Sequence, residues 1–121
     1  MLPASHRLNT AADFRHAVRR GRRAGGPLVV VHLATANVDK ETSSFDVARP
    51  VRVGFVVSRA VGPAVTRNRV KRRLRHLLRE RLGTLPADSV LVVRALPEAA
   101  GATYRDLGAA LDRCLARVVG S

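Results

Sequence analysis

The stretch from residue 64 to residue 82 reads AVTRNRVKRRLRHLLRERL. At about 100° per residue, its apolar residues fall on one side of a helix. These residues are Val70, Leu74, Leu77, Leu78 and Leu82. The roughly opposite side carries Asn68, Arg72, Arg75, His76 and Arg79, with Arg69 and Arg73 at the edge between the two sides. The spacing therefore predicts a helix that packs on a core through its leucines and presents its arginines outward.

The charge of this helix is almost entirely of one sign. Between Arg67 and Arg81 there are eight basic residues and one acidic residue, Glu80. Like charges at i and i+4, such as Arg75 and Arg79, destabilise an isolated helix by roughly a few tenths of a kcal/mol each. A bound polyanion removes this repulsion, so the helix is interpreted as a nucleic-acid-binding face rather than an ordinary solvated one. No zipper heptad continues it and no partner helix precedes it at turn distance, which argues against the common DNA-binding arrangements.

The composition of the whole chain supports a single globular RNA-binding or DNA-binding domain. The chain has 121 residues, of which 46% are hydrophobic, and we expect one domain over residues 1–121. Its 22 basic and 9 acidic residues give a net charge of +13, which favours a polyanionic partner. The single cysteine, Cys114, excludes a disulfide framework and is expected in the core. Neither a secretion signal nor a membrane-spanning run is evident, so the chain is expected in the cytoplasm, with no membrane partner.

Alternating and periodic apolar residues predict the remaining elements. Thr10 is predicted to cap a short helix that ends at Gly21, and strands are predicted over residues 28–36, 51–57 and 89–94. The polar residues 37–50 are expected to form an exposed loop. A last helix begins after Thr103, with Asp106 three residues on. We expect it to have one apolar stripe, formed by Tyr104, Leu107, Leu111, Cys114, Leu115 and Val118.

The order of these elements predicts an α+β fold. The two strands that flank the basic helix are free to lie parallel, because a helix of this length can return the chain to the same end of the sheet. The general rule for such a crossover is a right-handed turn.

Groups that could carry catalysis are dispersed along the sequence. The four histidines, His6, His16, His32 and His76, fall in different elements, and Asp39, Glu41 and Asp46 share one predicted loop. No catalytic set and no metal site built by this chain is therefore predicted. Phe14 and Val18 are either core residues or, beside the neighbouring arginines, a surface on which a base could stack.

The basic helix is part of a longer motif. Residues 53–79 read VGFVVSRAVGPAVTRNRVKRRLRHLLR, in which a strand ends at Ser58 and Arg59 and a Gly-Pro turn precedes the helix. This segment resembles the signature of the bacterial ribonuclease P protein subunit. Supporting matches are Asp13 and Phe14 before a basic helix, and the downstream strand near residues 90–94.

The resemblance implies a ribosomal-protein-like (S5 domain 2-like) α+β fold in which the crossover containing the basic helix is left-handed, against the general rule. It implies that a catalytic RNA, which binds Mg²⁺, removes the 5′ leader of precursor tRNA, while this chain assists as the protein subunit and has no catalytic residue of its own. The implied partners are that RNA and precursor tRNA, with no DNA, and the protein is expected to be monomeric in the ribonucleoprotein.

The resemblance also implies roles for particular positions. The positions that match the family's contacts to the catalytic RNA are Arg67, Asn68, Arg69, Lys71, Arg72 and Arg75. Those that match its leader-binding cleft are Phe14, Val18, His32, Ser58 and Arg59. Three positions depart from the pattern: Val18 and His32 stand where the family often has an aromatic residue, and Ala60 stands where a second basic residue is common.

Two other interpretations compete with this one. A ribosomal or tRNA-binding protein without a role in catalysis could use the same basic helix. A self-sufficient nuclease would cleave RNA without an RNA partner, but the dispersed histidines and carboxylates argue against it. Rescue of leader cleavage by the chain and the catalytic RNA at physiological magnesium discriminates among the three.

Overall fold

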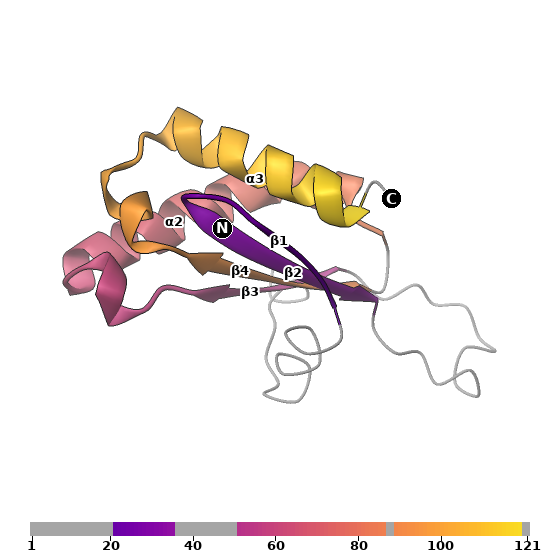
Figure 1. Cartoon of the computed structure of the whole chain (residues 1–121), viewed down its shortest axis with the longest axis horizontal. Coiled ribbons are helices and arrows are strands. Elements are labelled where there is room, and N and C mark those ends of the chain that lie inside the picture. The colour runs from indigo at the N-terminus through magenta and orange to yellow at the C-terminus, as the bar shows by residue number, and fades with distance from the viewer. Residues whose placement is uncertain (1–20, 36–50, 87–88, 120–121) are drawn as a thin grey trace.

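Four strands and two long helices form the part of the chain that the computed structural model describes, which is residues 21–35, 51–86 and 89–119 (Figure 1). The strands are β1 (Arg22–Gly25), β2 (Val29–Thr35), β3 (Arg52–Val56) and β4 (Ser89–Ala95). The helices are α2 (Ala64–Arg81) and α3 (Tyr104–Val119). Short 3₁₀ helices, η3 (Arg59–Val61), η4 (Leu82–Thr84) and η5 (Pro97–Gly101), connect them. The predicted helix that ends at Gly21 and the predicted loop 37–50 lie outside the described residues.

The strands form one mixed sheet in the order β1-β2-β4-β3. β2 is antiparallel to β1 and to β4, with Val31 opposite Val93. β3 and β4, which flank α2 in the sequence, are parallel, with Gly54 opposite Val92. This confirms the predicted α+β class and the parallel pair, and each predicted strand lies within two residues of its expected bounds.

The edge strand β1 is an element that the sequence analysis missed. Its residues, RRAG, have no apolar alternation, so nothing local marks it as a strand. It forms because the chain turns back tightly onto β2, where the Gly26 N–H donates to the Val29 carbonyl at 3.0 Å. Two arginines on an edge strand also discourage pairing with another chain.

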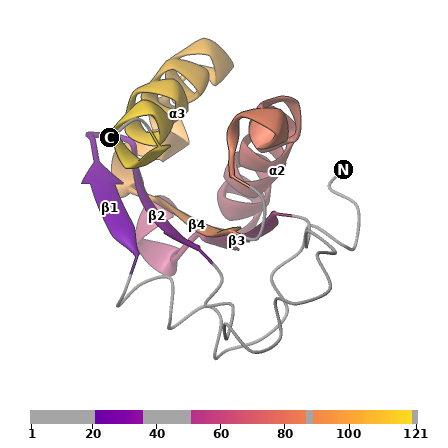
Figure 2. The same ribbon diagram turned by 90° about the vertical axis from the view of Figure 1, so that its right-hand side faces the viewer.

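Both helices lie on the same face of the sheet, with α3 over β1 and β2 and α2 over β4 and β3 (Figure 2). The core fills the space between them. Its fully buried side chains include Val29, Val31, Leu91 and Val93 from the strands and Leu74, Leu78, Leu107 and Leu111 from the helices. Burying each such side chain contributes about 1.5–3 kcal/mol before entropy costs, so this layer provides the main stabilisation.

The other face of the sheet carries its own small apolar cluster. Because side chains alternate along a strand, Ala34, Val90 and Val92 point away from α2 and α3 and pack together with Val56 beside them. β4 is thus buried on both faces, which explains its continuous run of valine and leucine.

The last helix begins as predicted but its apolar stripe is shorter. The backbone N–H of Asp106 donates to Thr103 Oγ1 at 3.0 Å, which is the expected cap. Cys114 is buried, as predicted, and burial raises the pKa of its thiol. The prediction is wrong for Tyr104, which is 40% exposed. Helical spacing indicates which side of a helix faces the core, but it does not indicate where the opposing surface ends.

Candidate nucleic-acid interface

Helix α2 is seated on the core by the leucine side that the sequence predicts. Val70, Leu74, Leu77 and Leu78 are all buried. The turn before the helix requires Gly62, whose φ is +151° and whose added Cβ would lie 3.1 Å from a Thr66 methyl group. The helix is therefore fixed at its start by backbone conformation and along its length by apolar packing.

The outward side of α2 forms what we call the α2 basic face: Asn68, Lys71, Arg72, Arg75 and Arg79. Asn68 and the three arginines are exposed, and Lys71 is half-buried. None of the five makes a hydrogen bond or ion pair with another described residue. As far as the described residues go, their cationic and amide groups are therefore available to a ligand, on a helix whose opposite side is packed on the core.

Other arginines of α2 are used within the protein. Arg67 Nε donates to the Gly62 carbonyl at 3.1 Å, across the turn that precedes the helix. Arg69 Nη2 donates to the carbonyl of Ala100 at 3.1 Å, and Arg73 Nη1 donates to that of Ala102 at 3.2 Å. The two bonds attach the segment after β4 to the side of α2. Of the six residues that the resemblance assigns to RNA contact, Arg67 and Arg69 bond backbone carbonyls of this chain. The other four have no partner among the described residues.

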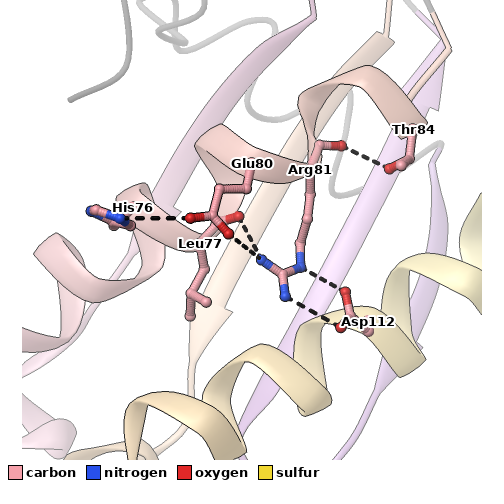
Figure 3. Close-up of polar contacts among 6 residues, drawn as sticks. All are labelled: His76, Leu77, Glu80, Arg81, Thr84 and Asp112. Atoms are coloured by element: carbon pink, nitrogen blue, oxygen red, sulfur yellow. Dashed lines mark hydrogen bonds and ion pairs between the residues drawn. The ribbon is translucent and has the colours of Figure 1, made fainter.

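The end of α2 is joined to α3 by a second polar cluster (Figure 3). Arg81 binds Asp112 with two hydrogen bonds, Nε to Oδ1 at 2.6 Å and Nη2 to Oδ2 at 3.2 Å. Arg81 Nη1 donates to the Leu77 carbonyl at 2.9 Å, and Glu80 lies 3.9 Å away. The Arg81 guanidinium lowers the pKa of the Asp112 carboxyl mainly through this hydrogen bond.

The same contact explains a glycine in α3. A Cβ added at Gly108 would lie 3.2 Å from Leu77 Cδ2 and 3.3 Å from Arg81 Nη2. A side chain here would push against Leu77 and against the guanidinium of the Arg81–Asp112 pair, so glycine suits this close approach of the two helices.

A second candidate surface is the sheet face away from the helices. His32 is 7% exposed there, and its Nδ1 has no hydrogen-bond partner in the part of the chain that the structure describes. Burial, followed by the nearby charges of Arg23 and Arg94, lowers the pKa of His32 below its ordinary value of 6.5. Arg23 lies opposite His32 in the β1–β2 register, and Arg94 lies opposite Val30 in the β2–β4 register.

The structure places only some of the leader candidates. His32 lies on β2, whereas the exposed Ser58 and Arg59 follow the end of β3, with β4 between the two strands. Phe14 and Val18 lie outside the described residues. Arg23 and Arg94 were not singled out from the sequence, because strand register alone brings them beside His32 and nothing local records that register.

Within residues 21–35, 51–86 and 89–119, no group of three or more histidine, cysteine, aspartate or glutamate side chains is placed to hold a metal ion. The same residues contain no helix long and apolar enough to cross a membrane.

Comparison with known proteins gives the family. Residues 2–119 match the Ribonuclease P family. The ribonuclease P protein component of Nocardioides sp. is 58% identical over 118 residues, covering 98% of this chain and 95% of the relative. That of Streptomyces avermitilis is 54% identical over 120 residues, covering 99% and 97%.

Solved structures agree with this similarity. The RNase P protein of Staphylococcus aureus superposes with a TM-score of 0.74 at 25% identity, covering 94% of this chain and 97% of that one. The RNase P protein of Thermotoga maritima, at 24% identity, shares the fold with a TM-score of 0.73 over 93% of this chain and 96% of that one. The chain thus belongs to the family of bacterial ribonuclease P protein components and is a protein subunit of ribonuclease P, the tRNA-processing endoribonuclease in which it partners the RNase P RNA.

Proposed function

We propose that the α2 basic face, with Arg67 and Arg69 at its inner edge, binds phosphates of the RNase P RNA. The observation that carries this proposal is a row of exposed cations without described partners on a rigid helix, in a chain of net charge +13. Arginine suits the task, because its planar fork can hold two phosphate oxygens at once. Each phosphate so neutralised should steepen the salt dependence of binding by about 0.7–0.9 log units.

We further propose that the 5′ leader of precursor tRNA lies along the sheet face away from the helices. Phe14, Val18, Ser58 and Arg59 are assigned to this surface from the family's pattern. Its described part supports the assignment, because the half-buried Val56 can contact a base while the exposed Arg94, its partner in the β3–β4 register, contacts the backbone.

The described arginines refine this assignment. His32 is 7% exposed, and it contributes to the floor of the surface. Arg23 and Arg94 are both exposed on the same face, so we assign the leader phosphates to them as well. Backbone charge and base faces carry little base identity, so leader binding should tolerate many sequences.

In this proposal the RNA subunit cleaves the phosphodiester and holds the Mg²⁺, which stabilises developing charge when bound there. The protein contributes positive charge: it reduces repulsion between leader and RNA, and it favours the precursor over the mature tRNA. We assign no catalytic residue and no metal ligand to this chain, and we propose that it acts in the cytoplasm as one domain and one copy per ribonucleoprotein.

The handedness of the β3–α2–β4 crossover is also part of the proposal. In Figure 1 the arrows of β3 and β4 point left, so in Figure 2 both strands run away from the viewer. From β3 the chain rises to α2 above the sheet and descends to β4 on the left. This counter-clockwise path supports a left-handed crossover, against the general preference for right-handed ones.

Cleavage of precursor tRNA by the chain and the RNase P RNA at limiting magnesium tests the RNA-binding part. We expect Arg72→Ala and Arg75→Ala to raise the magnesium concentration needed for half-maximal cleavage. Arg113→Ala, which removes an equally exposed charge from α3, is the matched control and should behave as the wild type. Wild-type magnesium dependence in both α2 variants would refute the assignment.

A second experiment tests the leader surface. Phe14→Ala and Arg94→Ala should weaken binding of precursor tRNA by the holoenzyme while leaving mature tRNA unaffected. Equal loss for both tRNAs would show that these residues do not contact the leader.

A further inference from the structure

Tyr104, the only tyrosine of the chain, is exposed beside the basic helix. This residue stands at the first turn of α3 and is 40% exposed. The ring of His76, on α2, lies 5.9 Å away between centroids, at an interplanar angle of 75°. The two nearly perpendicular rings form a corner. A flat group that stacks on the face of one ring therefore brings its edge against the other ring.

This corner is held in place by bonds already described. Arg69 and Arg73 bind the carbonyls of Ala100 and Ala102, the residues just before α3 begins. Thr103 then caps the helix through the Asp106 N–H. The backbone on the N-terminal side of Tyr104 is therefore attached to α2, and the ring needs little reordering to receive a ligand.

The charges around the corner suit a nucleic acid. Arg72 and Arg79 stand four residues before and three residues after His76, so they flank it on the exposed side of α2. Two acids accompany these cations: Asp106 stands in the first turn of α3, and Glu80 Oε1 lies 3.7 Å from His76 Nε2, with its Oε2 3.9 Å from Arg81 Nη1. The Arg81 guanidinium offsets part of the Glu80 charge and so reduces its repulsion of a phosphate.

We propose that Tyr104 and His76 form a stacking site for an unpaired nucleobase of the RNase P RNA, at the α3 side of the α2 basic face. The proposal rests on the function proposed for that face and adds to it a contact that reads the flat surface of a base rather than backbone charge. Such stacking tolerates any base, because every base has an aromatic face. It requires a base that is not stacked within an RNA duplex, so it favours a loop, a bulge or a single-stranded junction of the RNA.

The test measures affinity for the RNase P RNA alone across a salt series, without precursor tRNA. We expect Tyr104→Leu to weaken binding about 5- to 20-fold, toward the lower end of what loss of one stacked base costs. Tyr104→Phe keeps the ring and should stay within about twofold of the wild type. The slope of log affinity against log salt should not change in either variant, since no charge is removed.

Two controls run beside these variants. Val119→Ala shortens another exposed apolar side chain, at the opposite end of α3, and should bind as the wild type. A chemical probe needs no mutation: tetranitromethane nitrates exposed tyrosine, and the chain has one. Mass spectrometry should show that the RNase P RNA protects Tyr104 from nitration before any tRNA is added.

The outcomes separate the two proposals. Wild-type affinity in Tyr104→Leu, or full nitration in the RNA complex, would overturn the stacking site. If at the same time Arg72→Ala weakens binding and lowers the salt slope, the function proposed for the basic face still stands. If instead Tyr104→Leu loses affinity while Arg72→Ala and Arg75→Ala bind as the wild type, the stacking site stands and the phosphate-binding role of that face is wrong.

Discussion

Two adjacent arginines of α2 should lose different properties when each is replaced by alanine: Arg72 contributes to RNA binding and Arg73 to stability. Arg72 is exposed and has no described partner, whereas the half-buried Arg73 donates to the carbonyl of Ala102 at 3.2 Å. Replacing either by alanine removes one positive charge and leaves a good helix former. If charge alone mattered, the two variants would be indistinguishable.

The structure gives different magnitudes for the two. Arg72→Ala should lose one phosphate contact, so its salt slope should fall by about 0.7–0.9, with unfolding free energy unchanged within roughly 0.5 kcal/mol. Arg73→Ala should leave the Ala102 carbonyl without its partner, at about 1 kcal/mol, since water can replace part of that bond. For a chain of this size the loss corresponds to about 3–5 °C in Tm.

The assays are filter binding to the RNase P RNA across a KCl series, and thermal unfolding followed by circular dichroism. Arg72→Lys is the matched control, because it retains the charge and should retain the slope. A change of slope in Arg73→Ala equal to that in Arg72→Ala, with no loss of Tm in the former, would show that the division between outward and inward arginines is wrong.

Three further predictions concern stability. Arg81 lowers the pKa of Asp112, so the ion pair stabilises the folded state at pH values above the ordinary carboxyl pKa of 3.8. This stabilisation is lost as the pH falls below 3.8 and Asp112 becomes protonated. Asp112→Asn should therefore lower the free energy of unfolding in urea by ~0.5–1 kcal/mol at neutral pH and leave it unchanged in strong acid. His32 has a lowered pKa, so the unfolded chain takes up a proton that the folded chain does not as the pH falls through 6.5. Wild-type stability should thus decline from about pH 7.5 to about pH 5.5, and the decline should be smaller in His32→Gln, whereas an equal decline in both would assign it to other groups. Gly62→Ala should destabilise the fold by about 1–3 kcal/mol, because the backbone at this position has a φ of +151°. Gly83→Ala is the control, since an added Cβ there meets nothing within 4 Å, and it should leave Tm unchanged. Equal Tm values for the two variants would contradict the predicted strain at Gly62.

Some of the site could be predicted because its causes are local. The division of α2 into a leucine side and an arginine side needs only the helical period, and the buried Leu74 and exposed Arg72 follow it. The cap of α3 at Thr103 is equally local, since donor and acceptor lie three residues apart.

Other parts of the site depend on contacts between residues far apart in the chain. The carbonyls that Arg69 and Arg73 bind lie 31 and 29 residues away, so no pattern near the arginines indicates them. His32 receives its charged neighbours from two other strands, through register that one sequence does not encode locally.

The amino-acid sequence alone thus determines the family, the α+β class and the basic helix for which we propose RNA binding, because apolar period and charge are set by consecutive residues. Tertiary structure decides which arginines of that helix bond distant carbonyls, why β1 exists, and that Tyr104 is exposed beside His76 rather than buried. Each of these depends on where a distant backbone segment ends or turns, and packing of the whole chain is what sets that position.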